Sequence, residues 1–356
     1  MKILIGDILK STCSTLVNTV NCVGVMGKGI AKEFKEKYPE MFEDYVLRCE
    51  KKEVKPGEPY PYYDLLSGTM IINFHTKDHW RSASRLDYVI KGLDWFADNY
   101  NKLNIESVAF PPLGCGNGGL EWMTVGPIMY RKLKDLPIEV EIYAPYSATR
   151  KEISVDFLEN SVIKTSNVKG YKLGSYNKYW NLLLYSIQQL NNDRYSLHVG
   201  RTIYQKICYI LTAVGIPTGF VFSKSEYGLF SPEAKNALLI LANNNLINEE
   251  TKGKMIEINV SESFVLDKNA FSSDDFEKVN KALDLFYRFK NTESAEIIAS
   301  ILFASSELKN SGSVNADKLM HYLQEWKPRW NNDEYRNLLM EYSIELASMK
   351  WLSLSN

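Results

Sequence analysis

Short apolar segments alternate with longer segments of helical spacing along the first 145 residues. Five runs are apolar enough to form buried strands: 2–5, 16–20, 69–74, 105–110 and 139–144. Four segments between them have the spacing of amphipathic helices: 29–37, 39–52, 82–101 and 121–135. In the third of these, apolar residues recur every three or four positions and form one stripe. Strands that alternate with helices predict an α/β layered fold.

The character of the chain changes near Ser147. Residues 146–176 are polar and mixed in composition, as is typical of a boundary between domains. At 356 residues the chain also exceeds the usual size of a single domain. We therefore predict two domains, an α/β domain at 1–150 and a second domain at 165–356.

Helical spacing dominates the second domain. Three helices are predicted there, at 179–190, 202–214 and 231–243. The last begins with Ser231 in the position of an N-cap, followed by Pro232 at the first helical position. Short extended segments at 219–222 and 255–260 flank this helix. Helices followed by a small strand pair predict a winged-helix-like core within a mainly helical domain.

Two glycine-rich loops stand out in the first domain, VGVMGKGIA at 23–31 and PPLGCGNGGLEW at 111–122. Each follows an apolar run and leads into a segment of helical spacing. A strand that ends in glycines and opens a helix presents unpaired backbone N–H groups and the positive end of a helix dipole, which suit phosphate oxygens. Two such loops in one domain predict a ligand with two phosphates, held from both sides.

The composition of the chain limits the classes of function that it can have. Residues 1–150 hold 19 Lys and Arg against 19 Asp and Glu, and the remainder holds 23 against 24. Neither half is basic, so we expect any nucleic acid to be a transient substrate. No run of about 18 apolar residues is present, which argues against a membrane span. The five scattered cysteines, without a CxxC pair, predict free thiols and a cytoplasmic protein.

Polar side chains lie where the first two predicted strands end. Asp7 follows the first strand, and its carboxylate can accept an exocyclic amine such as that of adenine, or cap the following turn. Asn21 closes the second strand, and its amide can bond a ribose hydroxyl, brace the loop, or do both. Lys28 is not a phosphate-loop lysine, because the spacing GxxxxGK[ST] is absent. The sequence therefore disfavours a magnesium-dependent nucleotide hydrolase.

Lys77 lies in INFHTKDHWR, directly after the predicted central strand. A lysine at the carboxyl end of a buried strand is poised over a ligand in the crevice there. Its amine can attack an electrophilic sugar carbon or donate a proton to a leaving base. The alternative is a solvated loop lysine, but the neighbouring phosphate-type loops favour a catalytic role.

The residues around Lys77 suggest further contacts. His75 and His79 are four positions apart, but they straddle a strand end without a third ligand nearby, so we predict no metal site. His79, Trp80 and Arg81 can stack on a nucleobase and contact a phosphate of DNA, although packing of an exposed loop explains them equally well. Cys115 has no histidine base nearby and is interpreted as a small residue that fills its loop.

Taken together, GDIL, VNTVNCVGVMGKGIA, INFHTK and PPLGCGNGGLEW resemble the macro domain family. Members of this family are three-layer α/β/α modules with a mixed sheet, and they bind ADP-ribose. The resemblance covers about residues 1–146 and is greatest to the subgroup of the DarG antitoxins and the animal terminal ADP-ribose glycohydrolase.

The resemblance implies a complete ligand site without a cofactor. Asp7 would meet the adenine amine, the first loop would hold the distal ribose and a phosphate, and the second loop would cradle the diphosphate. Lys77 matches the lysine to which the subgroup assigns catalysis. The implied ADP-ribose contacts are Asp7, Ile8, Asn21, Val25, Met26, Gly27, Lys28, Gly29, Ile30, Thr76, Leu113, Gly114, Cys115, Gly116, Asn117 and Gly118.

One departure concerns the second loop. The animal relative has an aspartate where this chain has Gly118, so a carboxylate that would assist proton transfer is missing here. The DarG antitoxins are similar in lacking it and depend chiefly on the lysine.

Residues 200–234 and 323–339 resemble the YwgA-type domains of antitoxins. This implies that the second domain binds a DarT-like toxin, which is a DNA ADP-ribosyltransferase. We therefore expect an antitoxin that removes ADP-ribose from DNA bases, with thymine in single-stranded DNA as the expected base. The alternative is a non-catalytic ADP-ribose reader or a toxin-sequestering protein.

Overall fold

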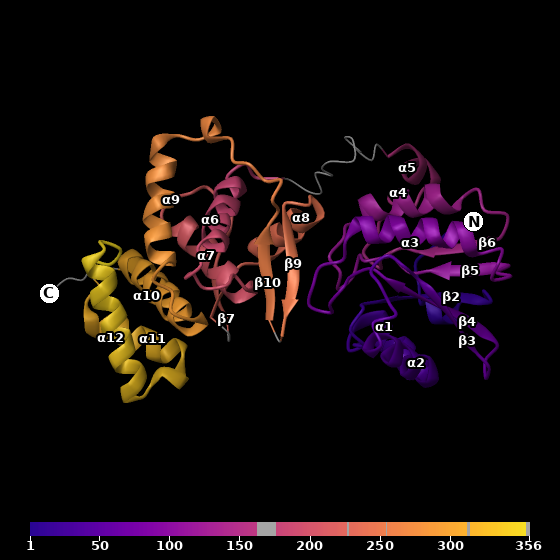
Figure 1. The fold of residues 1–356 in the computed structure, drawn as a ribbon, viewed down its shortest axis with the longest axis horizontal. Helices are drawn as coiled ribbons and strands as arrows, with labels where there is room; N and C mark the ends of the chain where they lie inside the picture. Colours follow the sequence, from indigo (N-terminus) through magenta and orange to yellow (C-terminus); the bar gives the residue numbers. More distant parts are fainter. Residues whose placement is uncertain (162–175, 226–227, 254, 312–313, 354–356) are drawn as a thin grey trace. The chain divides into compact units, whose positions relative to one another are not determined.

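A computed structural model describes residues 1–161, 176–225, 228–253, 255–311 and 314–353. The chain forms two compact units (Figure 1). The first takes in residues 1–161, and the second takes in most of the described residues from 176 onward. Residue 165, where the second domain was predicted to begin, lies outside the described residues.

A six-stranded mixed sheet forms the centre of the N-terminal unit, in the order β1-β6-β5-β2-β4-β3. The strands are β1 (Lys2–Leu4), β2 (Thr15–Val20), β3 (Tyr60–Asp64), β4 (Thr69–His75), β5 (Ser107–Phe110) and β6 (Glu139–Tyr143). Five of them run parallel, and only β3 pairs antiparallel, with β4. The carboxyl ends of the parallel strands therefore meet along one edge of the sheet, where ligands of open α/β sheets bind.

Helices cover both faces of this sheet. They are α1 (Gly29–Lys37), α2 (Pro39–Glu50), α3 (Leu86–Asn99), α4 (Trp122–Leu133) and α5 (Val155–Asn160). Figure 1 shows α1 and α2 on one face and α3 and α4 on the other, with α5 beside α4. The central strands β2, β4 and β5 are mostly buried between these layers, and the side chains of Val17, Ile72 and Val108 are fully buried. The predicted three-layer α/β/α fold is confirmed.

The edge strand β3 was not predicted from the sequence. Its sequence YPYYD ends in an aspartate and contains Pro61, which lacks the N–H that an interior strand must donate. At the edge, β3 needs to pair only with β4, with Pro61 opposite Ile72. Proline is therefore tolerated at this position, although the sequence pattern argues against a strand.

The C-terminal unit is mainly helical, as predicted. Its helices are α6 (Trp180–Asn192), α7 (Arg201–Ala213), α8 (Pro232–Asn243), α9 (Ser273–Phe286), α10 (Thr292–Ser311), α11 (Ala316–Trp326) and α12 (Asp333–Ser348). The Ser231 hydroxyl accepts the Ala234 N–H at 3.1 Å, so the predicted cap forms. An antiparallel hairpin of β9 (Ile247–Lys252) and β10 (Met255–Val260) follows α8 in winged-helix order. No helix among the described residues is long and apolar enough to cross a bilayer.

The predicted extended segment at 219–222 is wrong as a strand. The strands lie just beyond it, at β7 (Ser223–Ser225) and β8 (Gly228–Phe230). The Phe220 side chain is buried and stacks on Trp180 at a centroid distance of 5.9 Å. Phe222 contacts Tyr209 on α7, whereas Val221 is exposed. The two phenylalanines therefore pack against helices, which gives the segment the apolar pattern of a strand.

Candidate active site

The first glycine-rich loop is braced by Asn21 at the end of β2. The Asn21 Oδ1 accepts the Val23 N–H at 3.0 Å, and its Nδ2 donates to the Val25 carbonyl at 2.6 Å. The Tyr45 hydroxyl, on α2, donates to the same Oδ1 at 3.0 Å. Asn21 thus braces the loop, which was one of its two predicted roles. Tyr45 was missed because its position in an amphipathic helix indicates only a core residue.

Helix α1 opens directly from this loop. It begins at Gly29, which has a φ of +57°, and the preceding Lys28 provides no side-chain cap. The first N–H groups of α1 therefore lack a side-chain acceptor within the described residues. The side chain of Met26 is buried in the core, whereas Val25 is exposed. Unpaired backbone N–H groups at the amino-terminal end of a helix are suited to bind an anion.

The second glycine-rich loop folds around two left-handed glycines, Gly114 and Gly119, with φ values of +72° and +75°. The Leu120 N–H donates to the Gly114 carbonyl at 2.9 Å and closes the loop. Within the described residues, the N–H groups of residues 116–118 have no protein acceptor. Successive unpaired amides of this kind form a concave anion-binding nest. The Leu113 side chain is fully buried and anchors the start of the loop.

No side chain fits at Gly118. An added Cβ would lie 2.1 Å from the Ser84 Oγ and 2.5 Å from the Gly114 carbonyl oxygen. The Ser84 N–H also donates to the Gly118 carbonyl at 3.0 Å, and its hydroxyl donates to Thr76 Oγ1 at 3.0 Å. This packing leaves no space for the carboxylate that the animal relative has in its second loop. Ser84 was missed, because nothing in its sequence context indicates these contacts.

Lys77 lies between the two loops. It comes two residues after β4, and its Nζ donates to the Asn117 carbonyl in the second loop at 3.2 Å. The Cys22 N–H, at the start of the first loop, donates to the Asp78 carbonyl at 2.8 Å. A Cβ added at Gly29 would lie 2.8 Å from the Asn117 Nδ2, so the start of α1 lies against the second loop. The structure therefore brings the predicted lysine and both predicted loops together.

Asp7 caps a short 3-10 helix, η1 (Ile8–Lys10), by accepting the Leu9 N–H through Oδ1 at 3.0 Å. The capping role that the sequence left open is thus present. One oxygen makes this bond, and the contact of Asp7 with adenine remains a prediction. The Ile8 side chain is buried in the core, so it can reach a ligand only through its main chain.

His75 is a core residue. Its Nδ1 lies 3.1 Å from the Glu58 carbonyl, and its ring lies between those of Tyr45 and Tyr60. Burial lowers the pKa of His75 to about 4, so the ring is neutral at physiological pH. His79 stacks instead on Trp80. Within the described residues, no group of three or more His, Cys, Asp and Glu side chains could hold a metal ion.

Trp80 and Arg81 form an exposed surface three and four residues beyond Lys77. The His79 and Trp80 rings stack at a centroid distance of 5.6 Å, and the Arg81 guanidinium lies 4.6 Å above the Trp80 ring. Trp80 is 45% exposed. Stacked aromatic and cationic side chains of this kind suit the bases and phosphates of a single strand.

Cys115 is not a nucleophile at neutral pH. Burial raises the pKa of its thiol to about 12, and its Sγ lies 3.6 Å from the Leu113 carbonyl. The thiol is therefore protonated, and a catalytic cysteine would need to be a thiolate. That Cys115 is a small residue that fills its loop stays a prediction.

Comparisons with known proteins agree with this architecture. The model of the Macro domain family matches residues 17–129. A DNA ADP-ribosyl glycohydrolase of Thermus aquaticus is 29% identical over 332 residues, which cover 91% of this chain and 87% of the relative. A protein of the same name from Mycobacterium tuberculosis is 47% identical over 148 residues, which cover 41% of this chain and 42% of the relative.

A third relative joins two activities in its name. A DNA ADP-ribosyl transferase–DNA ADP-ribosyl glycohydrolase fusion protein of Thermosipho africanus is 41% identical over 157 residues. The match covers 39% of this chain and 40% of the fusion protein, so the chain spans about two fifths of that relative's length. Residues 17–129 of the N-terminal unit therefore match the macro domain family, and the chain as a whole is similar to a DNA ADP-ribosyl glycohydrolase.

Proposed function

We propose that this chain is a cytoplasmic antitoxin whose macro domain removes ADP-ribose from modified DNA bases, with thymidine in single-stranded DNA as the expected substrate. The observation that carries this proposal is the position of Lys77. Its Nζ is 3.2 Å from the second glycine-rich loop, where both loops meet. Relatives 47% and 29% identical carry the name of this activity.

The backbone of the two loops would bind the diphosphate. Residues 116–118 offer unpaired N–H groups from one side, and the uncapped start of α1 offers them from the other. Because these donors are fixed by the fold, they need little reorganisation when the ligand binds. Asp7 would accept the adenine amine at the far end of the ligand.

Lys77 would act on the glycosidic carbon that joins the ribose to the DNA base. The base is a poor leaving group, and its departure leaves positive charge on the sugar. We favour attack of the neutral amine on this carbon, which forms a C–N bond as the base leaves with the electron pair and takes up a proton. Water then hydrolyses the lysine–sugar adduct. In the alternative, the Lys77 ammonium protonates the leaving base.

Borohydride separates these two routes. It reduces the ring-opened Schiff base form of a lysine–sugar adduct, which then survives digestion and is detected by mass spectrometry. The nucleophilic route predicts an adduct at Lys77 during turnover of an ADP-ribosylated oligonucleotide. A reaction that runs at its normal rate without any trapped adduct would favour the acid route.

The decisive assay follows release of ADP-ribose from an ADP-ribosylated oligonucleotide by the full chain. The proposal predicts multiple turnovers and titratable binding of free ADP-ribose by calorimetry. Binding without release would establish the reader alternative. The absence of both binding and release would contradict an ADP-ribose site in this chain.

The surface of Trp80 and Arg81 is expected to contact the DNA strand. We predict that Trp80→Ala raises the KM for the ADP-ribosylated oligonucleotide about tenfold, since stacking on one base contributes about 1–3 kcal/mol. Binding of free ADP-ribose should not change, because this ligand does not reach the surface. Tyr63→Ala, which removes another exposed aromatic ring, is the control. Equal effects of Trp80→Ala on both ligands would contradict a DNA-contact role.

The C-terminal unit is expected to bind the toxin. The name of the fusion relative, which combines a DNA ADP-ribosyl transferase with the glycohydrolase, supports a toxin partner for this chain. The resemblance of residues 200–234 and 323–339 to antitoxin domains favours the C-terminal unit for that contact. We predict that the full chain with Lys77→Ala still forms a stable complex with a DarT-like toxin and inhibits it at a stoichiometric ratio. A chain ending at residue 161 should not. Inhibition that requires Lys77 would show that the chain acts on the DNA alone.

A further inference from the structure

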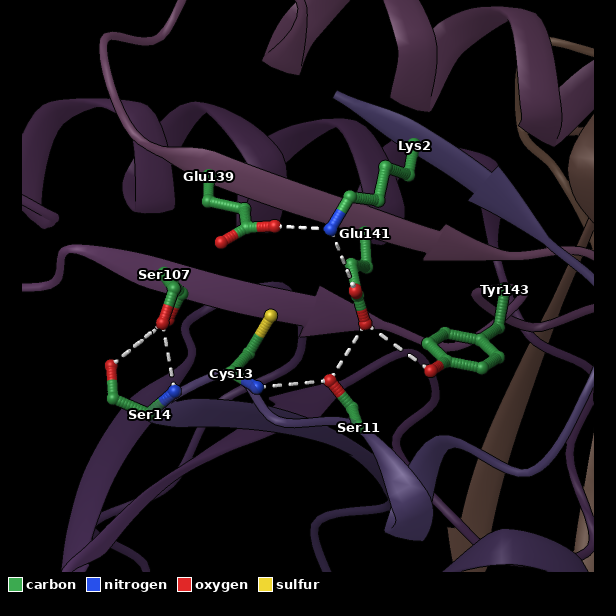
Figure 2. Close-up of polar contacts among 8 residues, drawn as sticks. All are labelled: Lys2, Ser11, Cys13, Ser14, Ser107, Glu139, Glu141 and Tyr143. Carbon is green, nitrogen blue, oxygen red and sulfur yellow. Dashed lines mark hydrogen bonds and ion pairs between the residues drawn. The ribbon is translucent and has the colours of Figure 1, made fainter.

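A buried carboxylate lies behind the turn that carries Asp7. Glu141, on β6, is only 6% exposed. Its Oε2 accepts hydrogen bonds from the Ser11 hydroxyl at 2.7 Å and from the Tyr143 hydroxyl at 3.2 Å. Its Oε1 lies 3.6 Å from the Lys2 ammonium. Figure 2 shows these three side chains converging on Glu141 from β1, β6 and the segment after η1.

Two hydrogen bonds fix the orientation of the Ser11 hydroxyl. Its Oγ accepts the Cys13 N–H at 3.1 Å, so the hydroxyl hydrogen points to Glu141 (Figure 2). The Ser11 N–H also donates to the Ile8 carbonyl at 3.0 Å and closes η1. A buried carboxylate that loses such donors is costly, because it cannot regain them from water. The contact between Ser11 and Glu141 therefore holds the end of η1 firmly on β6.

The same strand also supports the start of this turn. Gly6 directly precedes Asp7, and a Cβ added there would lie 3.8 Å from the Tyr143 ring. Tyr143 is itself held by its hydrogen bond to Glu141. The turn from Gly6 to Ser11 is thus seated on β6 at both ends, and Asp7 lies between the two contacts.

We propose that Glu141 and Ser11 are positioning residues that set the adenine selectivity of the ligand site. They act through the turn, by holding the Asp7 carboxylate at the place where it meets the adenine amino group. This inference rests on the proposed binding of ADP-ribose, and it adds residues that neither loop contains. Glu141 touches no ligand in this proposal, because its carboxylate is buried behind η1.

The test compares two ligands by calorimetry with the full chain. One is ADP-ribose, and the other is its 6-deamino analogue, which has hydrogen in place of the adenine amino group. The native chain should prefer ADP-ribose about tenfold, as expected for one hydrogen bond to a carboxylate. In Ser11→Ala and Glu141→Gln this preference should fall to about twofold or less, with the loss on ADP-ribose alone.

Glu139→Gln is the matched control. It makes the same chemical change on the same strand, but Glu139 is exposed and pairs with Lys2 rather than with the turn. This variant should keep the native preference. Asp7→Asn should remove the preference and serves as the reference for its complete loss.

The outcomes are distinguishable. Variants of Ser11 and Glu141 that are folded and retain the native preference would overturn the positioning role. An equal loss of affinity for both ligands would do so as well, because a merely structural role affects both. A native chain that binds ADP-ribose without preference would refute the adenine role of Asp7, and with it this inference, but not the proposed function. A native chain that binds neither ligand would refute the proposed function itself.

Discussion

Replacement of Lys77 by alanine is expected to lower the rate of ADP-ribose release from modified DNA by about a thousandfold, within the range that a positioned acid or base contributes. The dissociation constant for free ADP-ribose should change by less than about threefold, because the backbone of the loops provides most of the binding contacts. The two quantities are measured by single-turnover kinetics on an ADP-ribosylated oligonucleotide and by calorimetry.

Two further variants sharpen this experiment. Lys91→Ala removes a lysine on α3 that pairs with Glu58, and it is the control for loss of a positive charge. Lys77→Arg keeps the charge but cannot form the adduct, so it should be as inactive as Lys77→Ala if the amine is the nucleophile. A Lys77→Ala protein that clears the modification at the native rate would place catalysis elsewhere.

Gly118→Ala is expected to weaken the binding of ADP-ribose strongly and to destabilise the macro domain. The added methyl group would overlap with Ser84 Oγ and the Gly114 carbonyl, so either the loop or the Ser84 segment must shift. Overpacking of this kind costs about 1–3 kcal/mol. Because the residues that shift also carry the unpaired amides, binding should fall by more than about tenfold. Calorimetry and thermal unfolding measure the two effects.

Gly116→Ala is the matched comparison two residues away. A Cβ added there meets no heavy atom within 4 Å. The loss of affinity and stability should therefore be much smaller than for Gly118→Ala. Equal effects of the two substitutions would contradict the packing explanation. For the same reason, Gly118→Asp should not supply the carboxylate of the animal relative, but should behave like Gly118→Ala.

The elements of the macro domain were largely predictable from hydrophobic spacing, and the exceptions have local causes. The parallel strands β2 and β4 contain short apolar runs, which are typical of strands in the interior of a sheet. β3 is different, because its Pro61 and the exposed Tyr63 fit an edge position that the sequence does not reveal. The segment 219–222 has the pattern of a strand because Phe220 and Phe222 pack against helices rather than in a sheet.

Residues of the candidate site could be predicted where a side chain or loop of suitable chemistry directly follows a predicted strand. Lys77 and the two glycine-rich loops follow apolar runs, so their meeting at one edge of the sheet follows from a parallel arrangement. The supporting residues Ser84, Tyr45 and Glu141 could not be found in this way. Each acts through contacts with segments distant in the sequence, and its own neighbours give no signal.

The contacts of Ser84 have a consequence for the release of product. The Ser84 N–H donates to the Gly118 carbonyl in the second glycine-rich loop, and the Ser84 hydroxyl donates to Thr76, the immediate neighbour of Lys77. An outward swing of that loop would therefore pull the reactive amine away with it. If ADP-ribose leaves by such a swing, the loop and Lys77 would move together, and the proposed reaction could not resume until the loop returns.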